Sequence, residues 1–74
     1  MTEPYQDLAN AIILMAVKDY RSALKKLKKR PSYGPAQDIK NEVERFFRSD
    51  WYRELTSVDG TVLIKKLQAE VSEQ

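Results

Sequence analysis

The sequence predicts an all-α fold, a small helical bundle of three to four helices with one long N-terminal helix. Three observations favour this fold class. Apolar residues recur at spacings of three and four, which is the period of a helix with one buried face. The two glycines and three prolines of the 74-residue chain fall at the ends of these periodic segments. No segment shows the alternation typical of a strand, so we expect one helical domain over residues 1–74.

The first helix is expected over residues 5–29, because Pro4 precedes this segment and nothing inside it breaks a helix. Its middle, Ala11 to Val17, holds seven consecutive apolar residues, which cover every side of the helix. One interpretation places this helix at the centre of its own bundle. The interpretation that we favour is a homo-oligomer, in the simplest case an antiparallel two-fold dimer. Its self-association residues would be Ile12, Ile13, Leu14 and Val17.

The second helix is expected over residues 35–48, because Pro35 suits the first position of a helix. Its inward residues at helical spacing are Ile39, Val43, Phe46 and Phe47. Ser49 and Asp50 are good N-cap residues, which favours a break and a short third helix over residues 50–55. In the alternative, the second helix runs straight through to Leu55.

The last helix is expected over residues 60–71, with Asp59 as its N-cap. Its apolar stripe consists of Leu63, Ile64, Leu67 and Val71. A helix-turn-helix could be drawn from the third and fourth helices. The second of them offers only Lys65, Lys66 and Gln68 as polar contacts, which argues against sequence-specific DNA binding.

The composition excludes most catalytic chemistry. The chain has no cysteine and no histidine, so disulfides, thiolate or imidazole metal sites and Ser-His or Cys-His catalysis are absent. A domain of this size also has little room for a closed pocket. We therefore predict a protein that is not an enzyme and has no catalytic residues, no metal site and no cofactor.

The charge and hydropathy patterns concern partners and location. Residues 1–37 carry a net charge of +4 (seven Lys and Arg, three Asp and Glu), and residues 38–74 carry −2 (six and eight). No apolar run approaches the roughly 20 residues that span a bilayer. The start of the chain also lacks the basic character of a signal peptide. We therefore predict no membrane partner and a cytoplasmic location.

Two groups of residues are candidate contacts for a partner. The first is the basic end of the first helix, with Lys25, Lys26, Lys28, Lys29 and Arg30. Such a cluster can contact phosphates, but cations at a helix C-terminus also complement the helix dipole without any ligand. The second group is Arg48, Tyr52 and Arg53, which we expect to be exposed. Arginine and aromatic residues anchor protein partners, stack on nucleobases and can hold small anions.

Three other aromatic residues are expected in the core, because they continue the stripe of the second helix: Phe46, Phe47 and Trp51.

Several segments together resemble a group of short proteins encoded by phages and integrated mobile elements of Gram-positive bacteria. They are Ala16-Val17-Lys18-Asp19-Tyr20-Arg21, Ala23-Leu24, Leu27, residues 45–51, Leu55-Thr56, Asp59-Gly60, Leu63-Ile64 and Leu67. The resemblance covers most of the chain and is one of composition and spacing. It implies a small regulator, or an inhibitor that binds host machinery, and it transfers no functional residue.

The first functional hypothesis is therefore a non-enzymatic protein that binds a host protein or complex by surface contact, including as an inhibitor of host defence. The host cell cytoplasm would then be its location. The alternatives are a nucleic-acid-binding or regulatory protein that uses the basic end and the arginine and aromatic surface, and a binder of a small anionic ligand.

Overall fold

The computed structural model describes the backbone of residues 4–73 and the side chains of residues 6–73, and its regular structure there is entirely helical. Four helices follow in chain order: α1 (Pro4–Lys29), α2 (Gly34–Phe47), α3 (Asp50–Leu55) and α4 (Gly60–Ser72). Every bound lies within one residue of the range expected from the sequence. The prediction of an all-α fold with a long first helix is confirmed.

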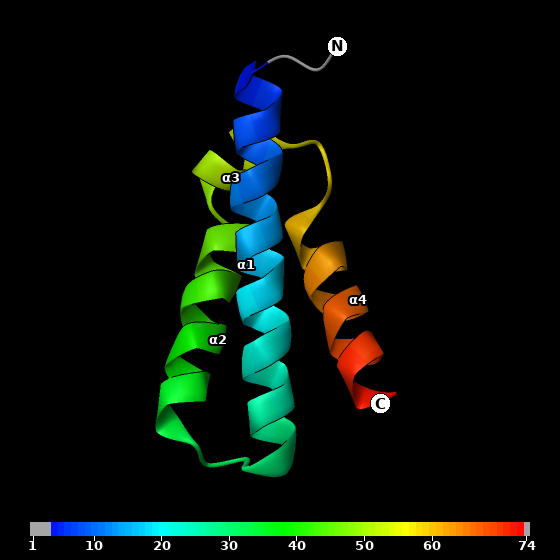
Figure 1. Ribbon diagram of the computed structural model, residues 1–74. Coiled ribbons are helices and arrows are strands. Elements are labelled where there is room, and N and C mark those ends of the chain that lie inside the picture. The colour runs from blue at the N-terminus through cyan, green and yellow to red at the C-terminus, as the bar shows by residue number, and fades with distance from the viewer. Residues whose placement is uncertain (1–3, 74) are drawn as a thin grey trace.

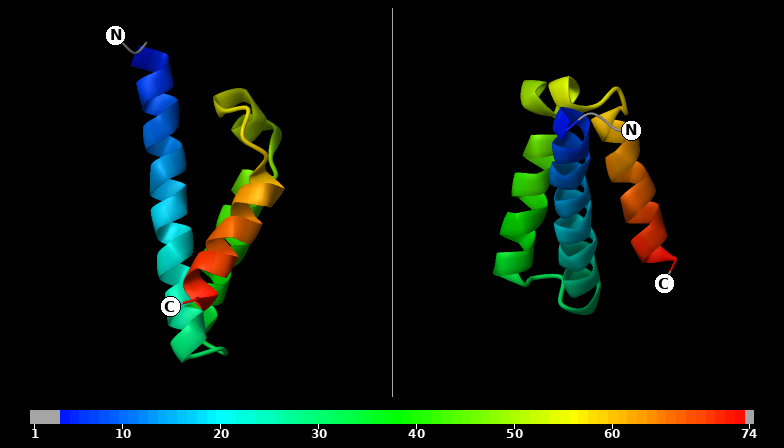
Figure 2. Two further views of the ribbon diagram at one scale, coloured as in Figure 1. Left: turned by 90° about the vertical axis from the view of Figure 1, so that its right-hand side faces the viewer. Right: turned by 45° about the horizontal axis from the view of Figure 1, so that its top comes forward.

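The four helices form a small elongated body of 42 × 22 × 18 Å. Helix α1 runs along its length, and α2 and α4 lie on either side of it (Figure 1). Figure 2 shows that the C-terminal half of α1 lies close to α2 and α4, whereas its N-terminal half leans away from α3 and from the connection over residues 56–59. The two halves of one helix therefore have different surroundings.

The core is built around three aromatic side chains from three helices. Tyr20 of α1, Phe47 of α2 and Tyr52 of α3 are each at most 2% exposed. The ring of Phe47 meets the other two edge to face, with centroids 5.9 Å from Tyr20 and 5.6 Å from Tyr52. Three aliphatic side chains complete this cluster: Val43, Ile64 and Leu67.

A polar network ties the C-terminal half of α1 to its neighbours. The Tyr20 hydroxyl donates to Oε2 of Glu44 on α2 at 2.6 Å and accepts from Nε2 of Gln68 on α4 at 3.1 Å. Arg21 pairs with Glu70 of α4 at 3.1 Å. Because one buried hydroxyl joins three helices, it fixes their register more firmly than apolar packing alone.

The break between α2 and α3 is present, as predicted. The Ser49 hydroxyl accepts a hydrogen bond from the backbone N–H of Tyr52 at 3.2 Å and so caps α3. The side chain of Asp59 caps α4 by accepting from the N–H groups of Thr61 and Val62 at 2.8 and 3.2 Å. Both N-caps could be read from the sequence because each is a short polar residue directly before its helix.

The break at Ser49 overturns two expectations about burial. Trp51 was expected in the core and is 54% exposed, whereas Tyr52 was expected on the surface and is 1% exposed. The aromatic stripe of α2 would reach Trp51 only if the helix continued. A new helix begins at Asp50 with a different rotational phase, which turns Tyr52 inward and Trp51 outward. Ile39, also expected to face inward, is 37% exposed.

At Gly60 the start of α4 lies very close to the end of α2. A Cβ atom at this position would lie 1.9 Å from the backbone oxygen of Phe47. No side chain fits into that space, so glycine is needed here because of proximity. Gly34, at the start of α2, has no atom within 4 Å of the corresponding position.

Candidate functional site

The most unusual surface of the molecule is apolar and surrounds the N-terminal half of α1. Leu8, Leu14 and Met15 on this half are 60%, 66% and 67% exposed. Trp51 of α3 and Val58 of the following connection are each 54% exposed. Clustered, exposed large apolar side chains are typical of interaction sites, since soluble monomers rarely leave such patches open.

One hollow, which we call the Trp51 groove, lies between α1 and the α2–α3 corner and has a volume of about 400 Å³. Its lining consists of Ile12, Met15, Ala16, Asp19, Glu42, Val43, Phe46 and Trp51. The Trp51 ring packs edge to face against Phe46, with centroids 5.5 Å apart, so its orientation is set by the core. The charged side chains that line this groove are the carboxylates of Asp19 and Glu42. The groove thus has an apolar floor and an acidic rim.

A second hollow, the Leu14 groove, lies on the other side of α1 against α3, the 56–59 connection and α4. It has a volume of about 330 Å³. Its lining consists of Asn10, Ile13, Leu14, Val17, Tyr52, Thr56, Val58 and Leu63. The N-terminal half of α1 therefore stands between two open grooves.

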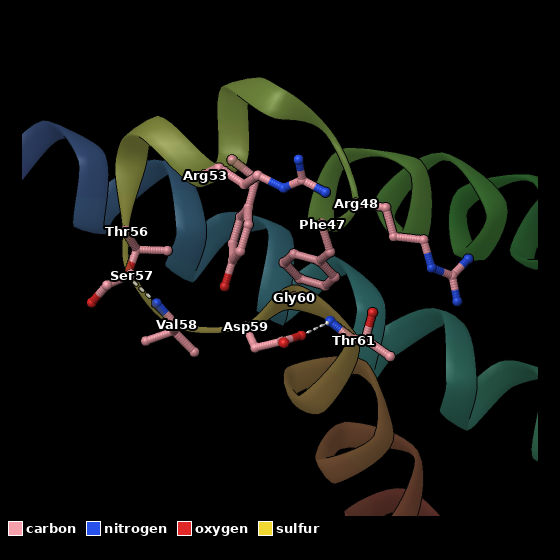
Figure 3. Close-up of a pocket in the computed structure, with 10 residues that line it drawn as sticks. Phe47, Arg48, Arg53, Thr56, Ser57, Val58, Asp59, Gly60 and Thr61 are labelled. Atoms are coloured by element: carbon pink, nitrogen blue, oxygen red, sulfur yellow. Dashed lines mark hydrogen bonds between the residues drawn. The ribbon is translucent and has the colours of Figure 1, made fainter.

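The predicted trio of Arg48, Tyr52 and Arg53 is brought together at a third hollow, of about 400 Å³. This hollow lies where the end of α2, α3 and the start of α4 meet. Figure 3 shows Arg48 and Arg53 on its α2–α3 side and Asp59 with Thr61 on its α4 side. The three residues are neighbours, although Tyr52 contributes a buried ring where an exposed one was expected.

The charges around this third hollow are largely balanced within the chain. Arg53 pairs with Asp50 at 3.3 Å, and Arg48 lies 3.8 Å from Glu44. Asp59 adds a negative charge and already occupies the first N–H groups of α4. A small anion would have to compete with these carboxylates for both arginines, so the hollow offers little net attraction for one.

The Tyr52 hydroxyl is the buried polar side-chain atom of the described residues that has no hydrogen-bond partner. Burial raises the pKa of Tyr52, and the negative charge of Asp59 raises it further. The hydroxyl therefore stays protonated and neutral at physiological pH.

Some basic residues at the end of α1 contact other parts of the chain, and others are exposed to solvent. Lys28 donates to the backbone oxygens of Val71 and Ser72 at 3.0 and 3.4 Å, which caps the C-terminus of α4. Arg30 lies over the Tyr33 ring at 4.8 Å from its centroid. Lys25, Lys26 and Lys29 are exposed. The basic end lies far from Arg48 and Arg53, because α2 runs back toward the start of α1 (Figure 1).

The four predicted self-association residues also have different surroundings in the structure. Ile13 and Val17 pack against the chain's own core, and Ile12 lines the Trp51 groove. Leu14 alone of the four is largely exposed, at 66%. The sequence could not distinguish them, because a run that is apolar on every side does not show which side the other helices cover.

Besides Trp51, which was expected in the core, three surface residues were missed as contact candidates: Leu8, Met15 and Val58. For Leu8 and Met15 a signal was available. Their spacing of seven places them on one face of α1, away from the face that carries the buried Tyr20. Val58 lies in a connection and carries no periodic signal.

The part of the chain that the structure describes contains neither a membrane-spanning helix nor a cluster of metal ligands. None of the helices within residues 4–73 is long and apolar enough to cross a bilayer. In the same part of the chain, no three or more Asp and Glu side chains gather in a way that could hold a metal ion. No protein-family model, curated protein or solved structure matches the chain.

Proposed function

We propose that the protein is a small non-enzymatic binding protein that acts by surface contact with a partner protein, and that the Trp51 groove is the contact. The observation that carries this proposal is the exposure of Trp51, 54%, beside an apolar groove. Tryptophan is enriched among the few interface residues that supply most of the binding energy. Its ring is already oriented by Phe46, so little side-chain entropy is lost on binding.

The lining of the groove favours one kind of partner segment. A helix that carries apolar side chains at positions i, i+3 or i+4 and i+7 would fill the apolar floor. Asp19 and Glu42 at the rim favour a lysine or arginine on that helix. The preferred partner is therefore a protein with an amphipathic helix that has basic residues beside its apolar face.

The resemblance to short proteins of phages and mobile elements extends the proposal to the partner's origin. In this proposal the partner is a host protein or complex in the host cell cytoplasm, and binding inhibits it, including where it belongs to host defence. The small size suits such a role, because a contact surface needs no closed pocket.

A selection experiment tests the groove. A display library of amphipathic helical peptides is selected against the protein, and the selected peptides are titrated while the emission of Trp51, the single tryptophan, is recorded. We expect peptides with apolar residues at helical spacing and at least one basic residue, and a blue shift of Trp51 emission. Trp51→Ala has no tryptophan, so its binding is measured with a fluorescent label on the peptide. This variant should bind the peptides about 30-fold more weakly, the loss typical of a hot spot.

The matched control is Val62→Ala. Val62 is 47% exposed but lies on α4, away from the groove. Its substitution should change the affinity by less than about twofold. Equal binding of the selected peptides to the Trp51→Ala variant would show that they use another surface, and the proposal would be wrong.

A second candidate function, nucleic-acid binding, is favoured by one observation. Four cations line a shallow hollow on the C-terminal half of α1: Lys18, Arg21, Lys25 and Lys26. Of these, Arg21 is already paired with Glu70. This candidate predicts binding to short DNA or RNA duplexes that falls steeply with salt and is lost in Lys25→Glu/Lys26→Glu. Binding that is absent or insensitive to salt would contradict it.

A further inference from the structure

The outer side of α1 carries a stripe that the Trp51 groove does not include. Asp7, Ala11, Leu14 and Lys18 follow one another at spacings of four, three and four, so they lie along one face of the helix. All four are exposed, and Leu14 is 66% exposed. The buried Tyr20 lies on the opposite side of the helix. We call these four residues the outer stripe.

The outer stripe is symmetric in spacing and complementary in chemistry. An acidic residue stands at one end, a basic residue at the other, and two apolar residues stand between them. If the chain is reversed, Asp7 takes the place of Lys18 and Ala11 takes the place of Leu14. A two-fold axis requires this kind of self-complementarity, because each residue must face its counterpart in the other copy.

We propose that a second copy of this chain pairs along the outer stripe, antiparallel and about a two-fold axis near Ile12 and Ile13. In this arrangement Ala11 of each copy meets Leu14 of the other, and Asp7 of each meets Lys18 of the other. The methyl group of Ala11 leaves room for the larger Leu14, which allows the two helix axes to approach to about 8–10 Å. Leu8 and Met15 flank the stripe and would lose part of their exposed surface.

Charge selects the antiparallel arrangement over the parallel one. In parallel helices Asp7 would face Asp7 and Lys18 would face Lys18, which is repulsive at both ends. Within the described residues neither Asp7 nor Lys18 has a hydrogen bond or ion pair in its own chain, so both are free to pair across an interface.

The charges beyond Lys18 limit how far the pairing extends. Arg21 and Lys25 continue on the outer side of α1. Antiparallel pairing about Ile12 and Ile13 places Arg21 beside the first residue of the partner's α1 and Lys25 beyond it, so the two basic ends point to opposite ends of the dimer. The contact is therefore confined to residues 7–18 of α1.

The size of the outer stripe sets the expected strength. A standard stable interface buries about 800 Å² on each partner. A stripe of four residues with two flanking side chains is smaller, so we expect a reversible dimer whose population rises with protein concentration. The outer stripe does not contain Trp51, so this pairing does not depend on the proposed function of the Trp51 groove.

Sedimentation velocity over a wide concentration range tests the pairing. We expect a monomer at low concentration and a dimer at high concentration. Asp7→Lys and Lys18→Asp should each weaken dimerisation by about tenfold, since each turns both attractive end contacts into repulsive ones. The double variant Asp7→Lys/Lys18→Asp should restore it, because the opposite charges face each other again. All three changes are at exposed positions and leave the core intact.

Two further variants separate this surface from the others. Leu14→Asp should abolish dimerisation, while Val62→Asp, at an exposed site on α4, should leave it unchanged. Trp51→Ala should leave dimerisation unchanged even if it abolishes peptide binding, so the two proposals can fail separately. A monomer at every concentration would overturn the pairing. A double charge variant no better than the single variants would also overturn it.

Discussion

The two halves of α1 belong to one continuous helix and yet meet different environments. The C-terminal half contributes Tyr20, fully buried, and Ala23, 1% exposed, and it is tied to α2 and α4 by hydrogen bonds. The N-terminal half contributes Leu8, Leu14 and Met15, each at least 60% exposed, and stands between two grooves. The hydrogen bonds to the other helices therefore lie in the C-terminal half of α1, and the exposed apolar side chains lie in its N-terminal half.

This difference teaches how so short a chain can combine a defined fold with an open contact surface. A domain of this size has few apolar side chains to place in its core. Here they are concentrated around Tyr20, whose hydroxyl adds specificity by donating to Glu44 and accepting from Gln68. The remaining apolar residues are then available for a partner. Changes around the C-terminal half of α1 should affect stability, and changes in its N-terminal half should affect association.

The largest expected effect is at Gly60, where the start of α4 lies against the end of α2. Gly60→Ala places a Cβ atom 1.9 Å from the backbone oxygen of Phe47, so α2 and α4 must separate. We expect a loss of about 3 kcal/mol in the free energy of unfolding, measured by urea denaturation. The control Gly34→Ala, which meets nothing within 4 Å, should be neutral or stabilising by about 0.5–1 kcal/mol. Equal effects of the two changes would contradict the close approach.

Next in size is a comparison of two buried tyrosines. Tyr20→Phe removes a hydroxyl with two hydrogen-bond partners and should cost about 1–2 kcal/mol. Tyr52→Phe removes a hydroxyl without a partner and should be neutral or stabilising. Urea denaturation of both variants checks this order, and a larger loss for Tyr52→Phe would contradict it.

A smaller effect concerns pH and Glu44. Burial alone would raise the pKa of Glu44, but the hydrogen bonds from Lys40 and Tyr20 outweigh it and hold the pKa below its ordinary value of 4.5. A lowered pKa in the folded state stabilises the fold above pH 4.5, and this stabilisation is lost as the pH falls through the folded-state pKa. The stability difference between the protein and Glu44→Gln should therefore shrink below pH 4.5. A difference that is constant with pH would contradict this.

The smallest effect is expected at Arg21. Its pair with Glu70 has both side chains 44% exposed, so solvent screens the attraction. Arg21→Gln should lower the free energy of unfolding by no more than about 0.5 kcal/mol. A loss of stability as large as that of Tyr20→Phe would mean that α1 and α4 are held together mainly by electrostatic attraction.

Much of the fold could be predicted from sequence because its signals are local. Ser49 and Asp59 cap the next helix through their own side chains, and proline and glycine lie at helix ends. The apolar stripe could not show that Trp51 is exposed and Tyr52 is buried. The break at Ser49 starts a new helix with a different rotational phase. The distinction between Ile13 and Leu14 depends on where α2 and α4 pack, which is a tertiary property.

The candidate site was only partly predictable for the same reason. Arg48, Tyr52 and Arg53 are close in sequence and so were expected together. The Trp51 groove joins α1 to the α2–α3 corner, so Met15 and Trp51 become neighbours only after folding. Lys28 was expected as an outward contact, and its bonds to the end of α4 also required the tertiary structure.

Hydrogen exchange along α1 tests most directly whether the two halves differ as described. At low protein concentration, the backbone amides of residues 8–15 should exchange faster than those of residues 20–27. As the concentration rises, exchange should slow at residues 8–15 and stay unchanged at residues 20–27, because only the N-terminal half of α1 contacts a second copy. Equal protection along the whole helix, independent of concentration, would show that α1 is packed uniformly. It would contradict the difference between its N-terminal and C-terminal halves.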